Sequence, residues 1–163
     1  DKGLTRFGRE VIRELNRLKI CTDLSHLNDK SFFGAIERAD YPIASHSNSR
    51  EICPTPRNLT DEQLRLIGEK NGLIGLCFYP KFLGGNAFEK IYENICCLGN
   101  LGLENNIAIG SDFDGADMPP ELSDISKVPD LYTYLEKRGI SAETLKKIFY
   151  ENAQNYFDKL SGI

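Results

Sequence analysis

The chain has 163 residues, of which 40% are hydrophobic, and this is enough apolar side chain for one domain with a sizeable core. Its net charge is -4, from 20 basic and 24 acidic residues spread along the sequence, so charge gives no reason to expect nucleic acid or an anionic membrane as a partner. No run approaches the roughly 18 consecutive apolar residues of a membrane span. We therefore expect a single soluble unit over residues 1–163.

The cysteines are five in number and show no C-x-x-C spacing. In a chain of this size an odd set without that spacing argues against a disulfide framework and predicts reduced thiols. Reduced thiols favour a cytoplasmic location, although the sequence leaves the compartment undetermined. Cys21 and Cys77 lie within apolar runs and are expected to be small core residues. The chain begins with Asp1 rather than Met, which suggests a fragment of a longer protein.

The predicted elements begin with a helix at residues 5–19. Apolar side chains recur there at helical spacing and indicate a stripe that faces a core. The stripe consists of Phe7, Val11, Leu15 and Leu18. Four strands follow, predicted at residues 20–24, 42–45, 73–79 and 107–111. Helices are predicted after them at about 28–39, 60–70 and 88–98 and, beyond a loop with three prolines, at 130–138 and 141–160.

Capping residues mark where several of these helices start. Asn28 is a suitable N-cap, and Thr60 with Gln63 has the spacing of a capping box. Ser141 is expected to cap the last helix, which should turn one apolar face inward. That face contains Leu145, Phe149, Tyr156 and Leu160.

Strands that alternate with helices indicate a parallel sheet with right-handed crossovers. Two α/β folds compete for this pattern. A doubly wound sheet would normally carry a glycine-rich phosphate turn at an early junction between strand and helix, and no G-x-G-x-x-G occurs in the chain. A (β/α)8 barrel needs about 250 residues, so this chain would supply four parallel strands and half of such a barrel.

The only two histidines in the chain, His26 and His46, each follow a predicted strand. Adjacent parallel strands lie about 4.8 Å apart, so side chains at corresponding strand ends can reach one zinc ion through bonds of about 2.0–2.1 Å. The alternative is that both are ordinary polar residues at strand ends. Two protein ligands alone do not complete a zinc site.

Three further residues are expected on the same rim. Asp112 ends the fourth strand, where a barrel enzyme places a general base or another metal contact, but an Asx turn with Gly115 would also explain it. Arg57, in the loop after the second histidine, has the bidentate geometry to hold a carboxylate or is simply solvated. Tyr79 either lines the rim or packs against the body of the protein.

Six segments, in order and over nearly the whole chain, resemble a known family. They read GLTRFGREVIRELNRL, DLSH, PIASHSNSR, PRNLTDEQ, GLIGLCFYP and IAIGSDFDG. The resemblance is to the membrane dipeptidase family, the renal dipeptidase-like peptidases of the amidohydrolase type. It implies a (β/α)8 barrel that hydrolyses dipeptides with two zinc ions, of which this chain would be the C-terminal half, strands five to eight.

The resemblance also implies roles for single residues. His26 and His46 match the two histidines that bind the second zinc, Asp112 matches the catalytic aspartate, and Arg57 matches the arginine that holds the substrate's C-terminal carboxylate. The family's first-strand His-x-Asp pair, its bridging glutamate and a substrate-binding histidine belong to the half that this sequence lacks. Arg6 stands where the family usually has proline.

The expected partners are therefore a dipeptide substrate and either the missing N-terminal half or a second copy of the chain. Two alternatives to the dipeptidase remain open. The exposed edges of a four-stranded parallel sheet invite pairing, so the chain could be a non-catalytic half-barrel assembly module. It could also belong to another hydrolase of the same barrel type, a deaminase or a lactonase.

Overall fold

A four-stranded parallel sheet lies at the centre of the computed structural model, which describes residues 2–162. Its strands are β1 (Thr22–Asp23), β2 (Pro42–Ala44), β3 (Leu73–Leu76) and β4 (Ile107–Ile109). They pair in the spatial order β1-β2-β3-β4, the same as their order along the chain. Each strand therefore adds to the same edge of the growing sheet.

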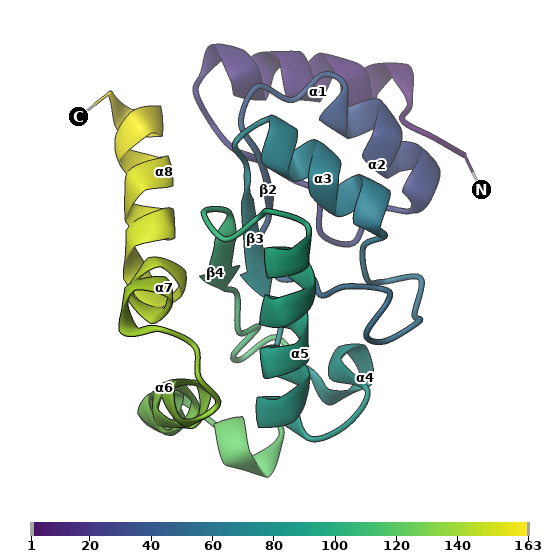
Figure 1. Cartoon of the computed structure of the whole chain (residues 1–163). Helices are drawn as coiled ribbons and strands as arrows, with labels where there is room; N and C mark the ends of the chain where they lie inside the picture. The colour runs from purple at the N-terminus through teal and green to yellow at the C-terminus, as the bar shows by residue number, and fades with distance from the viewer. Residues whose placement is uncertain (1, 163) are drawn as a thin grey trace.

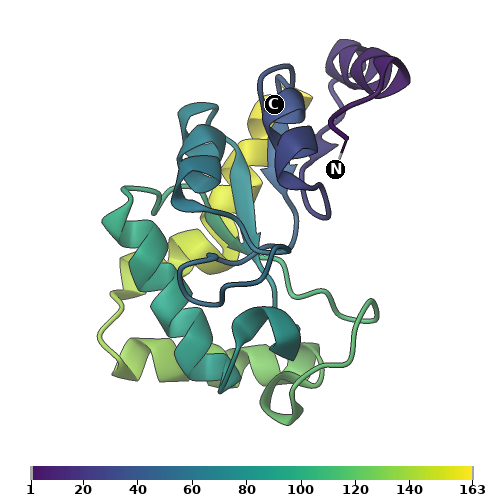
Figure 2. The same cartoon turned by 90° about the vertical axis from the view of Figure 1, so that its right-hand side faces the viewer.

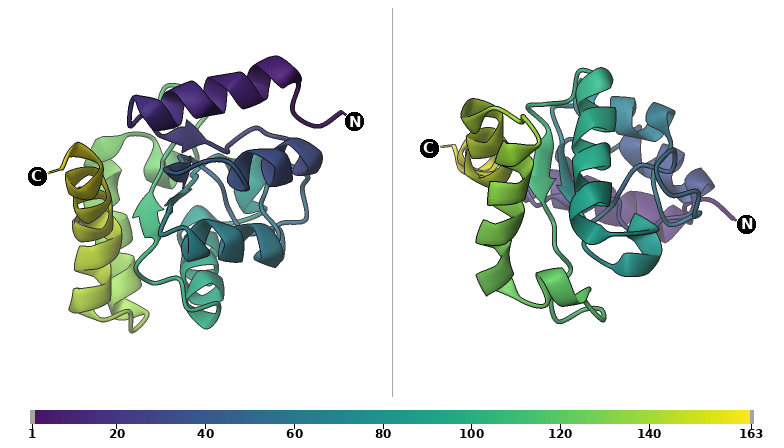
Figure 3. Two further views of the ribbon diagram at one scale, coloured as in Figure 1. Left: turned by 90° about the horizontal axis from the view of Figure 1, so that it is seen from above. Right: turned by 60° about the horizontal axis from the view of Figure 1, so that its bottom comes forward.

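Helices follow one another around this sheet in chain order (Figure 1; Figure 3). They are α1 (Arg6–Arg17), α2 (Asp29–Ile36), α3 (Asp61–Glu69), α4 (Pro80–Leu83), α5 (Ala87–Asn100), α6 (Val128–Lys137), α7 (Ala142–Lys146) and α8 (Asn152–Ser161). Two 3₁₀ turns, η1 (Pro120–Leu122) and η2 (Ile125–Lys127), precede α6, and a π-helical turn, η3 (Lys147–Glu151), joins α7 to α8.

The sequential strand order decides between the two candidate folds. Right-handed crossovers that always step in the same direction place every connecting helix on the same side of the sheet, as in a (β/α)8 barrel. A doubly wound sheet reverses direction at a switch point, and these four strands contain none. The prediction of an α/β fold with four parallel strands is confirmed.

The predicted capping residues form the expected hydrogen bonds at the starts of their helices. The side chain of Asn28 accepts a hydrogen bond from the backbone N–H of Ser31, and Ser141 does the same for Thr144. Thr60 and Gln63 form a full capping box, in which each side chain accepts a hydrogen bond from the other's backbone N–H. These bonds satisfy donors that have no partner within the helix.

The prediction that the apolar stripe of α1 faces a core is wrong for this chain. Phe7 is 73% exposed, Val11 38% and Leu18 48%, and the buried residue of α1 is Ile12. Figure 2 shows α1 standing out from the rest of the fold. The helix touches the sheet at its β1 edge and contributes Ile12 to the core, while Phe7, Val11 and Leu18 stay exposed.

Smaller corrections concern element bounds. The strands are shorter than predicted, because their last residues leave the ladder and turn into the loops of the rim. A short helix that was not predicted, α4, begins with a proline at its first position and ends at Gly84 in the left-handed conformation. The predicted last helix is interrupted by η3, and of its four apolar positions only Leu145 is fully buried.

Two glycines allow the loop after β2 to approach its neighbours closely. A Cβ atom on Gly75 would lie 2.1 Å from the carbonyl oxygen of Ser45, and one on Gly110 would lie 2.0 Å from the same oxygen. Both distances are far below van der Waals contact. The bare backbone of β3 and of the end of β4 thus lets Ser45, and with it His46, sit at the C-terminal edge of the sheet.

Replacing Gly110 with alanine is expected to destabilise the chain by about 1–3 kcal/mol or more, because backbone must move to admit the methyl group. Gly99→Ala, within α5, is the matched control: its Cβ has room, and alanine should stabilise the helix by about 0.4–1 kcal/mol. Urea denaturation of both variants measures the difference. Equal midpoints would contradict the close approach at Ser45.

Candidate metal centre

Two imidazole rings converge at the C-terminal edge of the sheet. His26 follows β1 and His46 follows β2, and their Nε2 atoms lie 2.8 Å apart, with 4.9 Å between ring centroids. His26 has a φ of 69°, a left-handed conformation that is uncommon for a residue with a side chain. The structure therefore brings together the two histidines that the sequence singled out.

A hydrogen-bond network lies behind His46. The Ser45 hydroxyl is 2.7 Å from Nδ1 of the ring and 2.5 Å from Oδ2 of Asp23. The other carboxylate oxygen, Oδ1, accepts hydrogen bonds from the backbone N–H groups of Ser25 and Ser45. One carboxylate thus holds the residue that precedes each histidine.

Asp112 faces the same point from the loop after β4. Its Oδ1 lies 4.0 Å from Nε2 of His46, and its side chain is 21% exposed. Its φ is 70°, and its main-chain carbonyl oxygen accepts a hydrogen bond from the backbone N–H of Gly115, so residues 112–115 form a backbone turn rather than the expected Asx turn. Cys77 is 4.0 Å away on the other side, between Sγ and Oδ2.

Arg57 is half-buried against the histidine loop. Its Nη1 donates to the Ser47 hydroxyl at 2.9 Å and its Nη2 to the carbonyl of His46 at 2.8 Å. The guanidinium also lies 5.1 Å from the ring centroid of Phe82. Its buried Nε finds no hydrogen-bond partner among the described residues, and burial lowers the pKa of the group.

A hollow of about 520 Å³ opens between the loops of this rim. It is lined by His26, Tyr79, Phe82, Asp112, Asp114, Gly115, Ala116 and Asp117. Tyr79 packs edge-on against Phe82, with 4.9 Å between the ring centroids, and presents its ring to the hollow. Arg57 does not line this space but lies behind Phe82.

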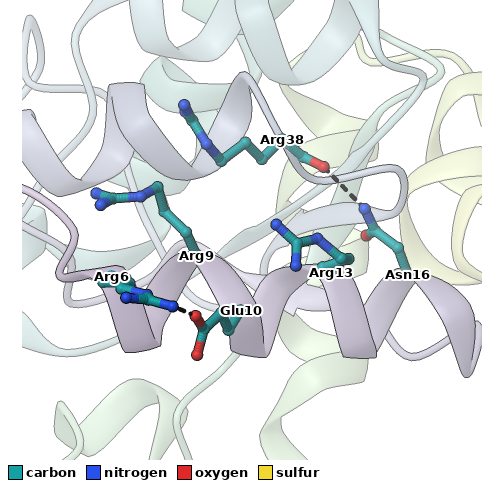
Figure 4. Close-up of a pocket in the computed structure, with 6 residues that line it drawn as sticks. All are labelled: Arg6, Arg9, Glu10, Arg13, Asn16 and Arg38. Carbon is teal, nitrogen blue, oxygen red and sulfur yellow. Dashed lines mark hydrogen bonds and ion pairs between the residues drawn. The ribbon is translucent and has the colours of Figure 1, made fainter.

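A slightly larger hollow, of about 580 Å³, lies away from the histidines between α1 and Arg38. Figure 4 shows Arg9 and Arg13 on α1 and Arg38 in the turn after α2, all three lining this hollow. It holds arginines and one glutamate but none of the aspartates or histidines of the rim. Size alone therefore does not locate the chemistry, and the rim hollow carries the reactive groups.

Comparison with known proteins settles the family. The model of the family described as "Membrane dipeptidase (Peptidase family M19)" matches residues 1–161. This chain belongs to the membrane dipeptidase family. Within residues 2–162, no helix is long and apolar enough to cross a membrane.

Relatives and solved structures agree with that assignment. An "Uncharacterized dipeptidase" of Schizosaccharomyces pombe is 36% identical over 93% of this chain and 39% of its own length. The crystal structure of a dipeptidase described as a metallopeptidase of family M19 superposes with a TM-score of 0.94 at 34% identity, over 100% of this chain and 51% of the other. A metallopeptidase from Rhodobacter sphaeroides, liganded with a phosphinate mimic of the dipeptide L-Ala-D-Ala, has a TM-score of 0.93 at 34% identity, over 98% of this chain and 48% of the other.

The match in length is partial. This chain spans between 36% and 58% of four curated relatives and about half of the two superposed structures. The described sheet, with β1 and β4 at its two edges, thus superposes on about half of each of these dipeptidase structures.

The residues on the rim fit part of a metal site for this family of metallopeptidases. Burial, then the charge of Arg57, lower the pKa of His46, with a smaller lowering from His26, while Asp112 and Asp23 act in the opposite direction. The ring is therefore neutral at neutral pH, the form in which histidine binds a metal. No cluster of three or more histidine, cysteine, aspartate or glutamate ligands exists within the part of the chain that the structure describes.

Sequence reasoning missed the residues that support this site. Asp23 and Ser45 hold the histidine loops, and the fully buried Asn48 ties the loop after β2 to β3 through the backbone N–H and C=O of Cys77. One signal was available, since Ser-His recurs at the ends of β1 and β2, and Asp23 stands three residues before the first histidine. Asn48 offered no comparable signal.

The thiol chemistry of the rim is open to a direct test. Cys77 is fully buried, and burial raises the pKa of its thiol to about 11, so it should be the slowest of the five cysteines to react with iodoacetamide near pH 8. Raising the pH toward 11 should speed its labelling. Peptide mass mapping after timed alkylation measures the order, with labelling in urea as the control in which all five react alike. Early labelling of Cys77 in the folded chain would contradict this.

Proposed function

We propose that this chain is the C-terminal half of a two-zinc dipeptidase, in which residues 1–163 form strands five to eight of the barrel. The observation that carries the proposal is the convergence of two imidazoles, with Nε2 atoms 2.8 Å apart and the Asp112 carboxylate 4.0 Å from one of them. Family membership supports the reading, because the same rim of a barrel holds the catalytic residues.

His26 and His46 would hold one of the two zinc ions. Zinc, when bound, lowers the pKa of a water molecule and polarises the scissile carbonyl. Asp112 lies within reach of the same position and would carry the proton from the attacking water to the leaving amine. The rest of the metal-binding set would come from the missing half, since the described residues offer only this partial set.

Tyr79 and Arg57 would bind the substrate. Tyr79 lines the rim hollow, and Arg57, whose guanidinium contacts the ring of Phe82 in that lining, has further Nη–H donors besides the two that anchor it. A guanidinium at this place is suited to the free carboxylate of a dipeptide, and it would reject longer peptides that lack a carboxylate one residue beyond the cut. The phosphinate dipeptide mimic bound by the Rhodobacter sphaeroides metallopeptidase supports a dipeptide-sized site.

The missing N-terminal half is the proposed partner of the open side of the fold. Phe7 and Val11 of α1 are exposed, and α1 contacts β1, an edge strand of the sheet, beside which the preceding strand and helix of a closed barrel would pack. The five free cysteines support a reducing compartment such as the cytoplasm.

The role of Asp112 predicts the result of one substitution in the complete enzyme. Asp112→Asn should lower turnover by about 10²–10⁴-fold, because the amide cannot take up a proton, while the zinc content stays the same. Asp130→Asn, on the exposed start of α6, removes the same charge away from the rim and should change neither quantity. Dipeptide hydrolysis and metal analysis test this, and near-normal turnover of the first variant would contradict the role.

The role of Arg57 predicts a specificity ratio. The complete enzyme should hydrolyse a dipeptide with a free C-terminus far better than its C-terminal amide. In Arg57→Lys that ratio of kcat/KM should fall by about 10–100-fold, which corresponds to the 1.5–3 kcal/mol of a charged hydrogen bond. The ratio cancels any general loss of activity caused by the altered anchoring of the loop. An unchanged ratio would show that another group reads the carboxylate.

A further inference from the structure

The contacts around Asp23 and Ser45 determine where His46 carries its ring proton. We propose that Asp23, acting through the hydroxyl of Ser45, is a positioning residue that keeps the proton of neutral His46 on Nδ1 and leaves Nε2 free to bind a metal. The inference deepens the proposed function and rests on it for its use, but the position of the proton can be measured without metal or substrate.

The argument begins with the number of protons available. As a carboxylate, Asp23 can only accept hydrogen bonds. Its Oδ1 takes the backbone N–H groups of Ser25 at 3.0 Å and Ser45 at 3.1 Å, and its Oδ2 lies 2.5 Å from Oγ of Ser45. The single hydroxyl proton of Ser45 must therefore point to Asp23.

The second step follows at the imidazole ring. Oγ of Ser45 has no further proton to give, yet it lies 2.7 Å from Nδ1 of His46. A hydrogen bond at that distance requires the ring nitrogen to be the donor. Neutral His46 thus carries its proton on Nδ1, and the lone pair on Nε2 faces the other histidine.

The third step concerns His26. Its Nε2 lies 2.8 Å from Nε2 of His46, and because the latter has only a lone pair to offer, the donor must be His26. In the metal-free chain the two rings therefore carry their protons on different atoms: Nδ1 in His46 and Nε2 in His26. The state of one ring dictates the state of the other.

The tautomer of His46 affects how tightly its Nε2 atom can bind a metal. A ligand whose second nitrogen is held by an acceptor presents its lone pair to the metal without rearrangement, and loss of such a partner typically lowers metal affinity by about 10–100-fold. Asp23 also holds the backbone of Ser25 and Ser45, the residues that precede the two histidines. It therefore sets both the position of the loops and the tautomer of one ring.

Asp23→Asn changes the direction of these bonds while preserving size. Its Oδ1 can keep both backbone donors, but its amide nitrogen now donates to Oγ of Ser45. The hydroxyl proton is then free to turn toward Nδ1 of His46, which drives the ring proton to Nε2. His26 should switch in the opposite sense, to Nδ1–H, so the variant reverses both rings.

Nitrogen-15 NMR of the full 163-residue chain tests this directly. His26 and His46 are the only histidines, so labelling with ¹⁵N-histidine yields four ring signals. The two signals that disappear in His46→Gln belong to His46, and the remaining two belong to His26. Spectra recorded without metal, well above the ordinary histidine pKa of about 6.5, should show Nδ1–H for His46 in the wild type and Nε2–H in Asp23→Asn. The apparent Kd for Zn²⁺ alone should rise about 10–100-fold in that variant.

Three further variants complete the design. Asp40→Asn removes an equal charge from an exposed position and should leave both tautomers and the Zn²⁺ affinity unchanged. Ser45→Ala breaks the connection and should abolish the preference for Nδ1–H, whereas Ser45→Thr keeps the hydroxyl and should restore it. These two carry the test if circular dichroism shows that Asp23→Asn does not fold.

Two results would overturn the inference: Nε2–H on His46 in the wild type, or the same tautomer in wild type, Asp23→Asn and Ser45→Ala. Neither depends on catalysis. Failure of the proposed dipeptidase activity would appear in the hydrolysis assay of the complete enzyme and would not move the ring signals, so the two proposals fail separately.

Discussion

The in-register pairing of four parallel strands is the constraint on which the rest of this structure depends. In the ladder between β1 and β2, Asp23 pairs with Ile43, and each histidine stands three residues beyond its member of that pair. Asp112 stands three residues beyond Ile109, the partner of Leu76. A slip of register by one residue would turn these side chains to the opposite face and separate them. Backbone hydrogen bonds between the strands thus set the distances within the candidate metal centre.

The rim combines that backbone order with two departures from it. Gly75 and Gly110 remove the side chains that would block the carbonyl of Ser45, and His26 and Asp112 adopt left-handed conformations that re-aim their side chains. Such conformations cost energy and persist only where the surroundings hold them. Here the holding groups are the carboxylate of Asp23 and the turn closed by Gly115. Strain at the rim is therefore opposed by hydrogen bonds from neighbouring loops.

Charge organises the same region at short range. Arg57 donates to the loop of His46 and lowers that ring's pKa, while the aspartates on either side raise it. Burial is the largest influence on the pKa of His46 and lowers it together with Arg57, so the imidazole is neutral at neutral pH. A neutral ring between an arginine and two carboxylates suits a ligand whose lone pair must be available.

Most of the apolar stripe of α1 lies outside the core. Ile12 is buried, whereas Phe7 and Val11 are exposed. The helix contacts β1, which lies at one edge of the described sheet. The wrong prediction for this stripe is therefore informative, since its periodicity indicates a contact that the longer relatives have the length to provide.

Local rules determined much of this protein from its sequence. The capping residues Asn28, Thr60 and Ser141 determined helix starts, because they act on backbone groups within one turn. The alternation of strands and helices determined a parallel sheet, and the placement of His26, His46 and Asp112 after strands determined that they share an edge.

Only the tertiary structure decided which face of α1 is buried, where η3 interrupts the last helix, and how Asp23, Ser45 and Arg57 engage His46. Those features depend on contacts between residues distant in sequence, and neither periodicity nor spacing encodes the direction in which such side chains meet.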